Sequence, residues 1–120
     1  MKKIIVTTTI NPPTEALIKF SKMKDWKLVV IGDQKTPEKE YKKLKDIIFL
    51  SPKDQERMSK RISDLIGWNC IQRRNFGFMY ASKLKADIIA SVDDDNIPLK
   101  NWGKNLLVGK YVYLPIYKDK

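Results

Sequence analysis

Three consecutive carboxylates, Asp93, Asp94 and Asp95, directly follow an apolar segment at residues 86–92. Adjacent carboxylates repel one another, and desolvation at the end of a strand raises that cost until a cation or hydrogen-bond donors offset it. Because neighbouring side chains in extended backbone face opposite ways, we expect Asp93 and Asp95 to share one face while Asp94 points elsewhere. An ordinary acidic turn at the surface is the alternative interpretation.

The chemistry that these carboxylates could support is the binding of a hard dication. The chain contains no histidine, and oxygen ligands suit Mn²⁺ or Mg²⁺ better than zinc or copper. Such ions usually take one or two protein carboxylates together with substrate phosphate. The pattern therefore predicts a Mn²⁺ or Mg²⁺ site at Asp93 and Asp95, with a diphosphate as its ligand.

A second group of candidate residues follows the first apolar segment of the chain. Thr7, Thr8, Thr9 and Asn11 offer hydroxyl groups and an amide that could line a nucleotide pocket. The alternative is that the threonines are there for their strand propensity. Asn11 is expected to cap a helix in either case.

Asp33 and the pair Arg73 and Arg74 are further candidates. Asp33 ends the second apolar segment, so it could accept hydrogen bonds from a ribose or base, or it could belong to an ordinary Gly-Asp turn. Arg73 and Arg74 stand near the start of a predicted helix, where guanidinium and backbone N–H groups could meet phosphate or a base edge. A solvated cationic turn is the equal alternative for the arginines.

An alternation of apolar and amphipathic segments would position these residues. Apolar segments predict strands at residues 3–10, 26–31, 47–50 and 86–92. Helices are expected from Asn11, with Pro12 in the first turn, from Ser51, and from Ile71 to about Lys85, with one helical turn at residues 38–42. The alternation predicts an α/β fold with a mainly parallel sheet and flanking helices. For residues 101–120 the sequence predicts a helical turn and then a strand at residues 111–116, where Pro115 favours an edge position.

Composition limits the classes of function. A chain of 120 residues with 42% hydrophobic content can form a single domain over residues 1–120. Its formal charge of +10 attracts phosphates, nucleic acid or anionic lipid without choosing among them. Cys70 is the only cysteine, which with the absence of histidine excludes disulfides, Cys/His zinc sites and imidazole catalysis. We find no signal-peptide or membrane-spanning pattern, and we expect a cytoplasmic setting.

Four segments together resemble a known family. They read IVTTTINPPT from Ile5, LVVIGD from Leu28, RRNFGFMYA from Arg73 and SVDDDNIP from Ser91. In this order and at predicted strand ends, they resemble glycosyltransferase-A fold proteins of the STELLO type and, more distantly, reversibly glycosylated polypeptides. The resemblance covers residue 3 to about residue 100.

The resemblance implies a short glycosyltransferase-A fold, a Rossmann-like nucleotide-diphospho-sugar transferase domain. It implies that the motif at Asp93 to Asp95 holds Mn²⁺ or Mg²⁺ against the diphosphate of a nucleotide sugar, with a UDP-sugar favoured and Asp94 among the ligand contacts. It also implies nucleotide contacts from Thr7 to Asn11, from Asp33 and from Arg73 to Asn75. The given chain continues for 25 residues beyond the aspartates, whereas fold relatives continue with segments that bind the acceptor and can supply the catalytic base.

Three functional hypotheses follow. The first is a metal-dependent transferase that moves a sugar from a nucleotide-diphosphate donor to an unknown acceptor. The second is a non-catalytic nucleotide-sugar-binding module or fragment that lacks the acceptor half. The third is a basic nucleic-acid-binding protein, which we rank last because the lysines are spread over several segments without a recognised nucleic-acid-binding pattern.

Overall fold

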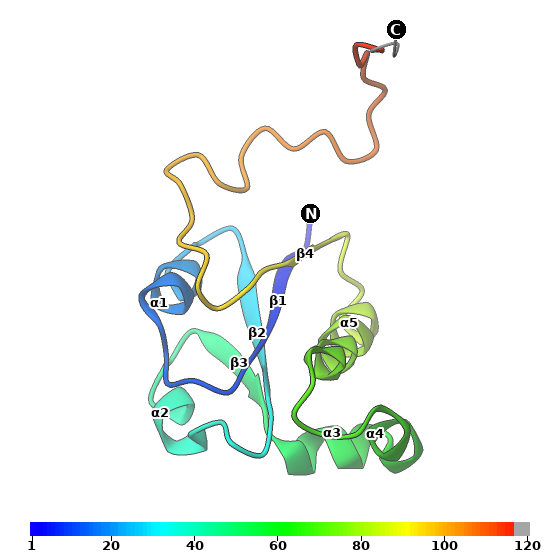
Figure 1. The fold of residues 1–120 in the computed structure, drawn as a ribbon. Coiled ribbons are helices and arrows are strands. Elements are labelled where there is room, and N and C mark those ends of the chain that lie inside the picture. The colour runs from blue at the N-terminus through cyan, green and yellow to red at the C-terminus, as the bar shows by residue number, and fades with distance from the viewer. Residues whose placement is uncertain (117–120) are drawn as a thin grey trace, which may run out of the picture.

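The computed structural model describes residues 1–116, and its centre is one parallel β-sheet. The strands are β1 (Lys3–Thr9), β2 (Lys27–Gly32), β3 (Ile47–Leu50) and β4 (Ile88–Ser91), in the order β3-β2-β1-β4 (Figure 1). Every neighbouring pair is parallel. The predicted α/β class and parallel sheet are therefore confirmed, and the strand positions agree with the sequence to within a few residues.

The strand order reverses direction beside β1. The chain steps from β1 outward to β2 and β3, and then returns to place β4 on the other side of β1. Open α/β sheets bind ligands at such a reversal, outside the carboxyl ends of the strands. Pairing of Thr9 with Gly32, and of Val6 with Ser91, brings the exits of β1, β2 and β4 to one edge.

Helices cover both faces of the sheet (Figure 1). The helices α1 (Glu15–Ser21) and α2 (Glu38–Lys42) pack on one face, in a core that includes Leu17, Phe20 and Tyr41. The opposite face carries α3 (Pro52–Met58), α4 (Lys60–Ile66), a 3₁₀ turn η1 (Ile71–Arg73) and α5 (Arg74–Lys83). Successive residues along each strand point alternately into the two cores, as expected for a sheet that is buried on both sides.

Close contact of α5 with the sheet depends on Gly77. This residue is fully enclosed, and a Cβ atom added there would lie 2.2 Å from Cγ1 of Val6 and 3.2 Å from Cγ1 of Ile31. The absence of a side chain lets the helix backbone approach β1 and β2. The same approach fixes the position of Arg74, which starts α5 one turn earlier.

Local signals fixed one helix start correctly and another wrongly. Ser51 caps α3 through a reciprocal capping box with Asp54, as its sequence predicts. Asn11 does not cap α1, because Thr14 does so by accepting a hydrogen bond from the backbone N–H of Leu17. No separate sequence signal predicted α4, which begins at Lys60, directly after Ser59 has ended α3 as its C-cap and started α4 as its N-cap.

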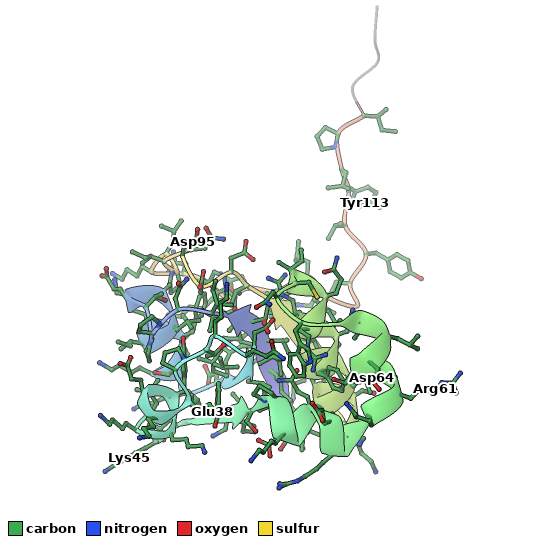
Figure 2. All side chains as sticks on the ribbon, turned by 60° about the horizontal axis from the view of Figure 1, so that its bottom comes forward. Glu38, Lys45, Arg61, Asp64, Asp95 and Tyr113 are labelled. Atoms are coloured by element: carbon green, nitrogen blue, oxygen red, sulfur yellow. The ribbon has the colours of Figure 1, made fainter. Side chains whose placement is uncertain are left out.

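The predicted edge strand at residues 111–116 is not formed. These residues have no regular secondary structure, and their large apolar side chains are mostly exposed. Tyr113 projects from a segment that runs away from the sheet and helices (Figure 2). Residues 117–120 of the predicted tail lie outside the described residues. Within residues 1–116, no helix combines the length and the apolar character that crossing a bilayer requires.

Candidate functional site

A cavity of about 380 Å³ opens at the carboxyl edge of the sheet. Four segments that are distant in sequence form its walls: the exit of β1, the exit of β2, the loop before α5, and the turn after β4. Its lining residues are Thr8, Thr9, Ile10, Asn11, Asp33, Asn69, Cys70, Ile71, Arg74, Asp93, Asp94 and Asp95. The structure thus gathers most of the residues that the sequence singled out around one space.

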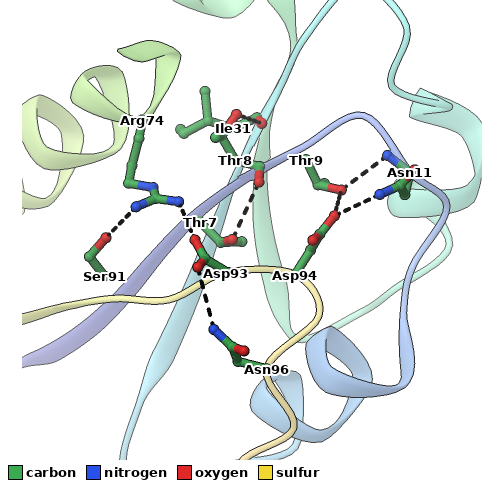
Figure 3. Close-up of polar contacts among 10 residues, drawn as sticks. All are labelled: Thr7, Thr8, Thr9, Asn11, Ile31, Arg74, Ser91, Asp93, Asp94 and Asn96. Atoms are coloured by element: carbon green, nitrogen blue, oxygen red, sulfur yellow. Dashed lines mark hydrogen bonds and ion pairs between the residues drawn. The ribbon is translucent and has the colours of Figure 1, made fainter. Parts of the chain in front are cut away.

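Asp94 is tied to the exit of β1. Its Oδ2 atom accepts a hydrogen bond from Oγ1 of Thr9 at 2.6 Å and another from Nδ2 of Asn11 at 2.9 Å (Figure 3). The hydroxyl of Thr14 donates to the main-chain oxygen of Asp94. Two charge-assisted bonds and one backbone contact therefore fix the middle of the aspartate run against β1.

Asp93 is paired with an arginine. Nη2 of Arg74 lies 2.8 Å from Oδ1 of Asp93, while Nη1 donates to the hydroxyl of Ser91 (Figure 3). Oδ2 of Asp93 has a longer contact, 3.4 Å, with the amide of Asn96. The Nε atom of Arg74 is buried and has no hydrogen-bond partner among the described residues. Arg74 thus brings positive charge to the cavity beside one carboxylate.

Asp95 is exposed, as is Asp93, and it also lines the cavity. Asp93 and Asp94 each bind a side chain of another segment. The carboxylate of Asp95 has no such partner within residues 1–116. The three carboxylates therefore have three environments: one faces an arginine, one is held by a hydroxyl and an amide, and one faces the cavity and solvent.

The donor set suits a hard dication that brings much of its own coordination shell. No group of three Asp, Glu, Cys or His side chains in the described part of the chain forms a ready-made metal cage. Asp93 and Asp95 do line the same cavity, and both offer carboxylate oxygen. Mg²⁺ and Mn²⁺ commonly take one or two carboxylates and complete their shells with water and phosphate oxygen. The residues present fit that arrangement.

Tyr41 forms a hydrogen bond with the backbone that follows β1. Its side chain is fully buried and its hydroxyl donates to the main-chain oxygen of Asn11 at 2.6 Å. Burial raises the pKa of Tyr41 from 10.0 to about 12, and the nearby charge of Asp94 acts in the same direction. The phenol therefore stays protonated, as a donor to Asn11 must.

Asp33 lines the cavity but its carboxylate serves the backbone. It is only 2% exposed. Its oxygens accept hydrogen bonds from the backbone N–H of Asn69, at 2.9 and 3.1 Å, and from that of Gln34 at 2.7 Å. The carboxylate thus joins the exit of β2 to the loop that precedes α5.

The sequence predicted that Arg73 could contact phosphate or a base edge, but the structure buries its side chain in the interior. Its side chain is fully buried, and its guanidinium donates to Gln55, Ser63 and Gly67. It also lies 3.6 Å from the centre of the Trp68 ring. Burial lowers the pKa of Arg73, yet an arginine remains charged. Because these partners occupy the guanidinium in the interior, it cannot meet a phosphate in the cavity.

Two further candidates also lie outside the cavity lining. Thr7 is fully buried, and Asn75 is exposed on α5. Neither residue is among those that form the cavity walls. Thr8 does line the cavity, but its hydroxyl donates to the main-chain oxygen of Ile31, so it also links β1 to β2.

Sequence reasoning missed the wall formed by Asn69, Cys70 and Ile71. Asn69 and Cys70 lie in the loop after α4, a helix that the sequence did not predict, and Ile71 begins η1. A signal was available in Gly67, which is followed closely by Asn69, because both residue types favour left-handed turns. The structure places both at positive φ, 77° and 57°.

Two known proteins from Arabidopsis thaliana are similar to this chain. The probable glycosyltransferase STELLO2 is 34% identical over 93 residues, and the probable glycosyltransferase STELLO1 is 32% identical over 93 residues. Over that stretch the chain resembles STELLO proteins. The matched stretch covers 78% of this chain but only 12% of each relative. No family model matches the chain.

The similarity agrees with the resemblance seen in the four sequence segments. It supports a relationship to glycosyltransferases, and the parallel sheet with helices on both faces is consistent with a domain of that kind. A match to about one eighth of a relative does not carry over that protein's activity, donor or acceptor.

Proposed function

We propose that this chain binds a nucleotide-diphosphate sugar in the cavity at the carboxyl edge of the sheet and acts as a glycosyltransferase-like protein. One observation carries the proposal above the others: Arg74 and the carboxylates of Asp93 and Asp95 border the same cavity at the β1/β4 reversal. Arg74 supplies positive charge itself, and the two carboxylates can bind a dication that supplies more. A diphosphate needs both, because it carries more negative charge than one arginine neutralises.

The proposed division of labour follows from the contacts. Asp93 and Asp95 would hold Mn²⁺ or Mg²⁺, which as a Lewis acid stabilises a departing nucleoside diphosphate. Arg74 lies at the start of α5 and can turn its guanidinium from Asp93 to a phosphate oxygen. Thr9 and Asn11 anchor Asp94 and so keep the run in register with β1. Such preset geometry lowers the cost of ordering the site on binding.

Donor binding and sugar transfer are separate parts of the proposal. The cavity residues account for binding, and a UDP-sugar is the favoured donor. No described residue is assigned as the catalytic base, and the acceptor is unknown. A module that binds the donor without transferring the sugar is therefore the second candidate, because every role proposed here for a cavity residue concerns the donor.

The test is a calorimetric titration with several sugar nucleotides, each with and without Mn²⁺. We expect binding that requires the dication and that weakens at least tenfold in Asp93→Asn and in Asp95→Asn, since each removes a charged ligand. Asp64→Asn is the matched control, because Asp64 is an exposed carboxylate on α4 on another part of the surface from Asp95 (Figure 2). Its affinity should equal that of the parent protein.

The outcomes separate the candidates. Failure of every sugar nucleotide to bind with Mn²⁺ present would overturn the proposal. Binding without release of sugar to water or to any acceptor supports the donor-binding module. A control titration with single-stranded nucleic acid at rising salt tests the third hypothesis, because affinity based on phosphate contacts with the +10 chain falls steeply with salt.

A further inference from the structure

The loop after α4 is held from two sides. On the side of β2, the carboxylate of Asp33 accepts hydrogen bonds from the backbone N–H of Asn69. On the side of α5, Nη1 of Arg73 donates to the main-chain oxygen of Gly67 at 3.1 Å. The guanidinium also stacks on Trp68, with 3.6 Å to its ring centre. A short loop thus lies between a buried anion and a buried cation.

The backbone of this loop needs such support. Gly67 has φ 77° and ψ −173°, a region open in practice only to glycine. Asn69 follows in the left-handed region at φ 57°, which costs a residue with a Cβ atom free energy. Hydrogen bonds from outside the loop offset that cost and select this one conformation.

The loop forms the wall of the cavity on the β2 side. Asn69, Cys70 and Ile71 line the cavity together with the aspartate run. Asn69 is bonded to the exit of β2, whereas the aspartates follow β4, and these strands flank β1 on opposite sides. The wall at residues 69–71 therefore borders the space that remains once a diphosphate occupies the aspartate end.

We infer that Asp33 is a positioning residue that acts through residues 69–71, and that this wall contacts the nucleoside end of the ligand. Asp33 is 2% exposed and its carboxylate already accepts hydrogen bonds from two backbone N–H groups, so it offers little surface to a base or ribose. The wall offers an amide at Asn69 and an apolar side chain at Ile71, which suit a base edge and a base face. This inference rests on the proposed function and assigns its nucleoside contacts.

The first experiment measures hydrogen exchange of the backbone amides at residues 67–71 in the ligand-free protein. Asp33→Ala removes every acceptor for the amide of Asn69, so its exchange should become at least tenfold faster. Asp33→Asn keeps one acceptor oxygen and should give an intermediate rate. Ser51→Ala, which removes only the cap of α3, controls for general destabilisation and should leave the exchange of the Asn69 amide unchanged.

The second experiment measures the affinity for UDP and for a UDP-sugar with Mn²⁺. Affinity should fall in the same order as amide protection: parent, Asp33→Asn, Asp33→Ala. Asn69→Gly keeps the N–H group and tolerates φ 57°, so it should leave Asp33 bonded yet weaken UDP binding about threefold or more. It also tests the wall if the Asp33 variants do not fold.

The results distinguish positioning from direct contact. Lower affinity with unchanged exchange at residues 67–71 would show that Asp33 touches the ligand itself and would overturn the inference. Faster exchange with unchanged affinity, or full affinity in Asn69→Gly, would show that the wall does not contact the ligand. If the parent protein binds no sugar nucleotide, the proposed function fails, while the exchange data still decide whether Asp33 holds the loop.

Discussion

Replacing Gly77 by alanine tests how the fold positions the site. The new Cβ atom would lie 2.2 Å from Cγ1 of Val6, whereas carbon atoms in contact normally stay about 3.5–4.0 Å apart. Either Val6 or the whole of α5 must move by roughly 1.5 Å. Because Gly77 faces two strands of a buried sheet, neither movement finds open space.

The expected loss of stability combines two opposing effects. Overpacking of a core costs about 1–3 kcal/mol and sometimes more, and the severity of this contact favours the upper end. Alanine gains about 1 kcal/mol over glycine in helix propensity. We therefore expect Gly77→Ala to lower the free energy of unfolding by about 2 kcal/mol, which for a domain of this size corresponds to a fall in Tm of about 8 °C.

Urea unfolding and differential scanning calorimetry measure this change, with Ser82→Ala on the exposed side of the same helix as the control. The double variant Val6→Ala/Gly77→Ala removes the clash and should recover about 1–3 kcal/mol relative to the sum of the single variants. Donor affinity should also fall in Gly77→Ala, since Arg74 lies one turn away. Stability equal to or above that of the parent protein would refute the close approach of α5.

Three other perturbations address separate features. Ser51→Ala should cost about 1 kcal/mol of stability, because the backbone N–H of Asp54 loses the Ser51 hydroxyl that accepts its hydrogen bond. Urea unfolding measures this loss, and an unchanged midpoint would contradict the cap. Gly67→Ala should cost about 1–3 kcal/mol from backbone strain alone, since nothing lies within 4 Å of its added Cβ. Urea unfolding measures this loss, and an unchanged free energy of unfolding would contradict a strained backbone at residue 67. The pKa of Tyr41 is raised to about 12, so its contribution is complete below pH 10 and is lost as pH rises toward 12. The stability difference between the parent and Tyr41→Phe should therefore shrink by about 2 kcal/mol over that window, and a constant difference would contradict a buried neutral phenol.

The sheet was predictable because its signals are local and strong. Four apolar segments rich in β-branched residues gave the strands, and their alternation with helices gave the parallel arrangement. The failures have local causes as well. Asn11 is a good N-cap by residue type, but its amide bonds Asp94, which lies 83 residues away in sequence, and Thr14 caps the helix instead. The exposed tail at residues 111–116 has strand propensity, but it pairs with no strand of residues 1–116.

The site was predictable in outline because parallel strands bring their carboxyl ends to one edge. That rule places the aspartate run, the β1 exit and Asp33 around one cavity. Side-chain direction could not be read in the same way. Arg73 and Arg74 are adjacent, yet one packs on Trp68 in the interior and the other reaches Asp93. Arg73 ends the 3₁₀ turn and Arg74 begins α5, and no residue pattern in the sequence predicted that turn.

The folded chain stabilises two of the three aspartates with its own side chains. Repulsion alone predicts a cluster that needs a dication to be tolerated. In the folded chain, however, Thr9 and Asn11 stabilise Asp94, Arg74 stabilises Asp93, and Asp95 keeps its solvent exposure. Much of the electrostatic cost is thus offset before any ligand arrives. On the proposed function, a dication alone must displace Arg74 from Asp93, whereas a diphosphate draws that guanidinium to itself and frees the carboxylate. Metal and diphosphate should therefore strengthen each other's binding, with equal coupling in both directions.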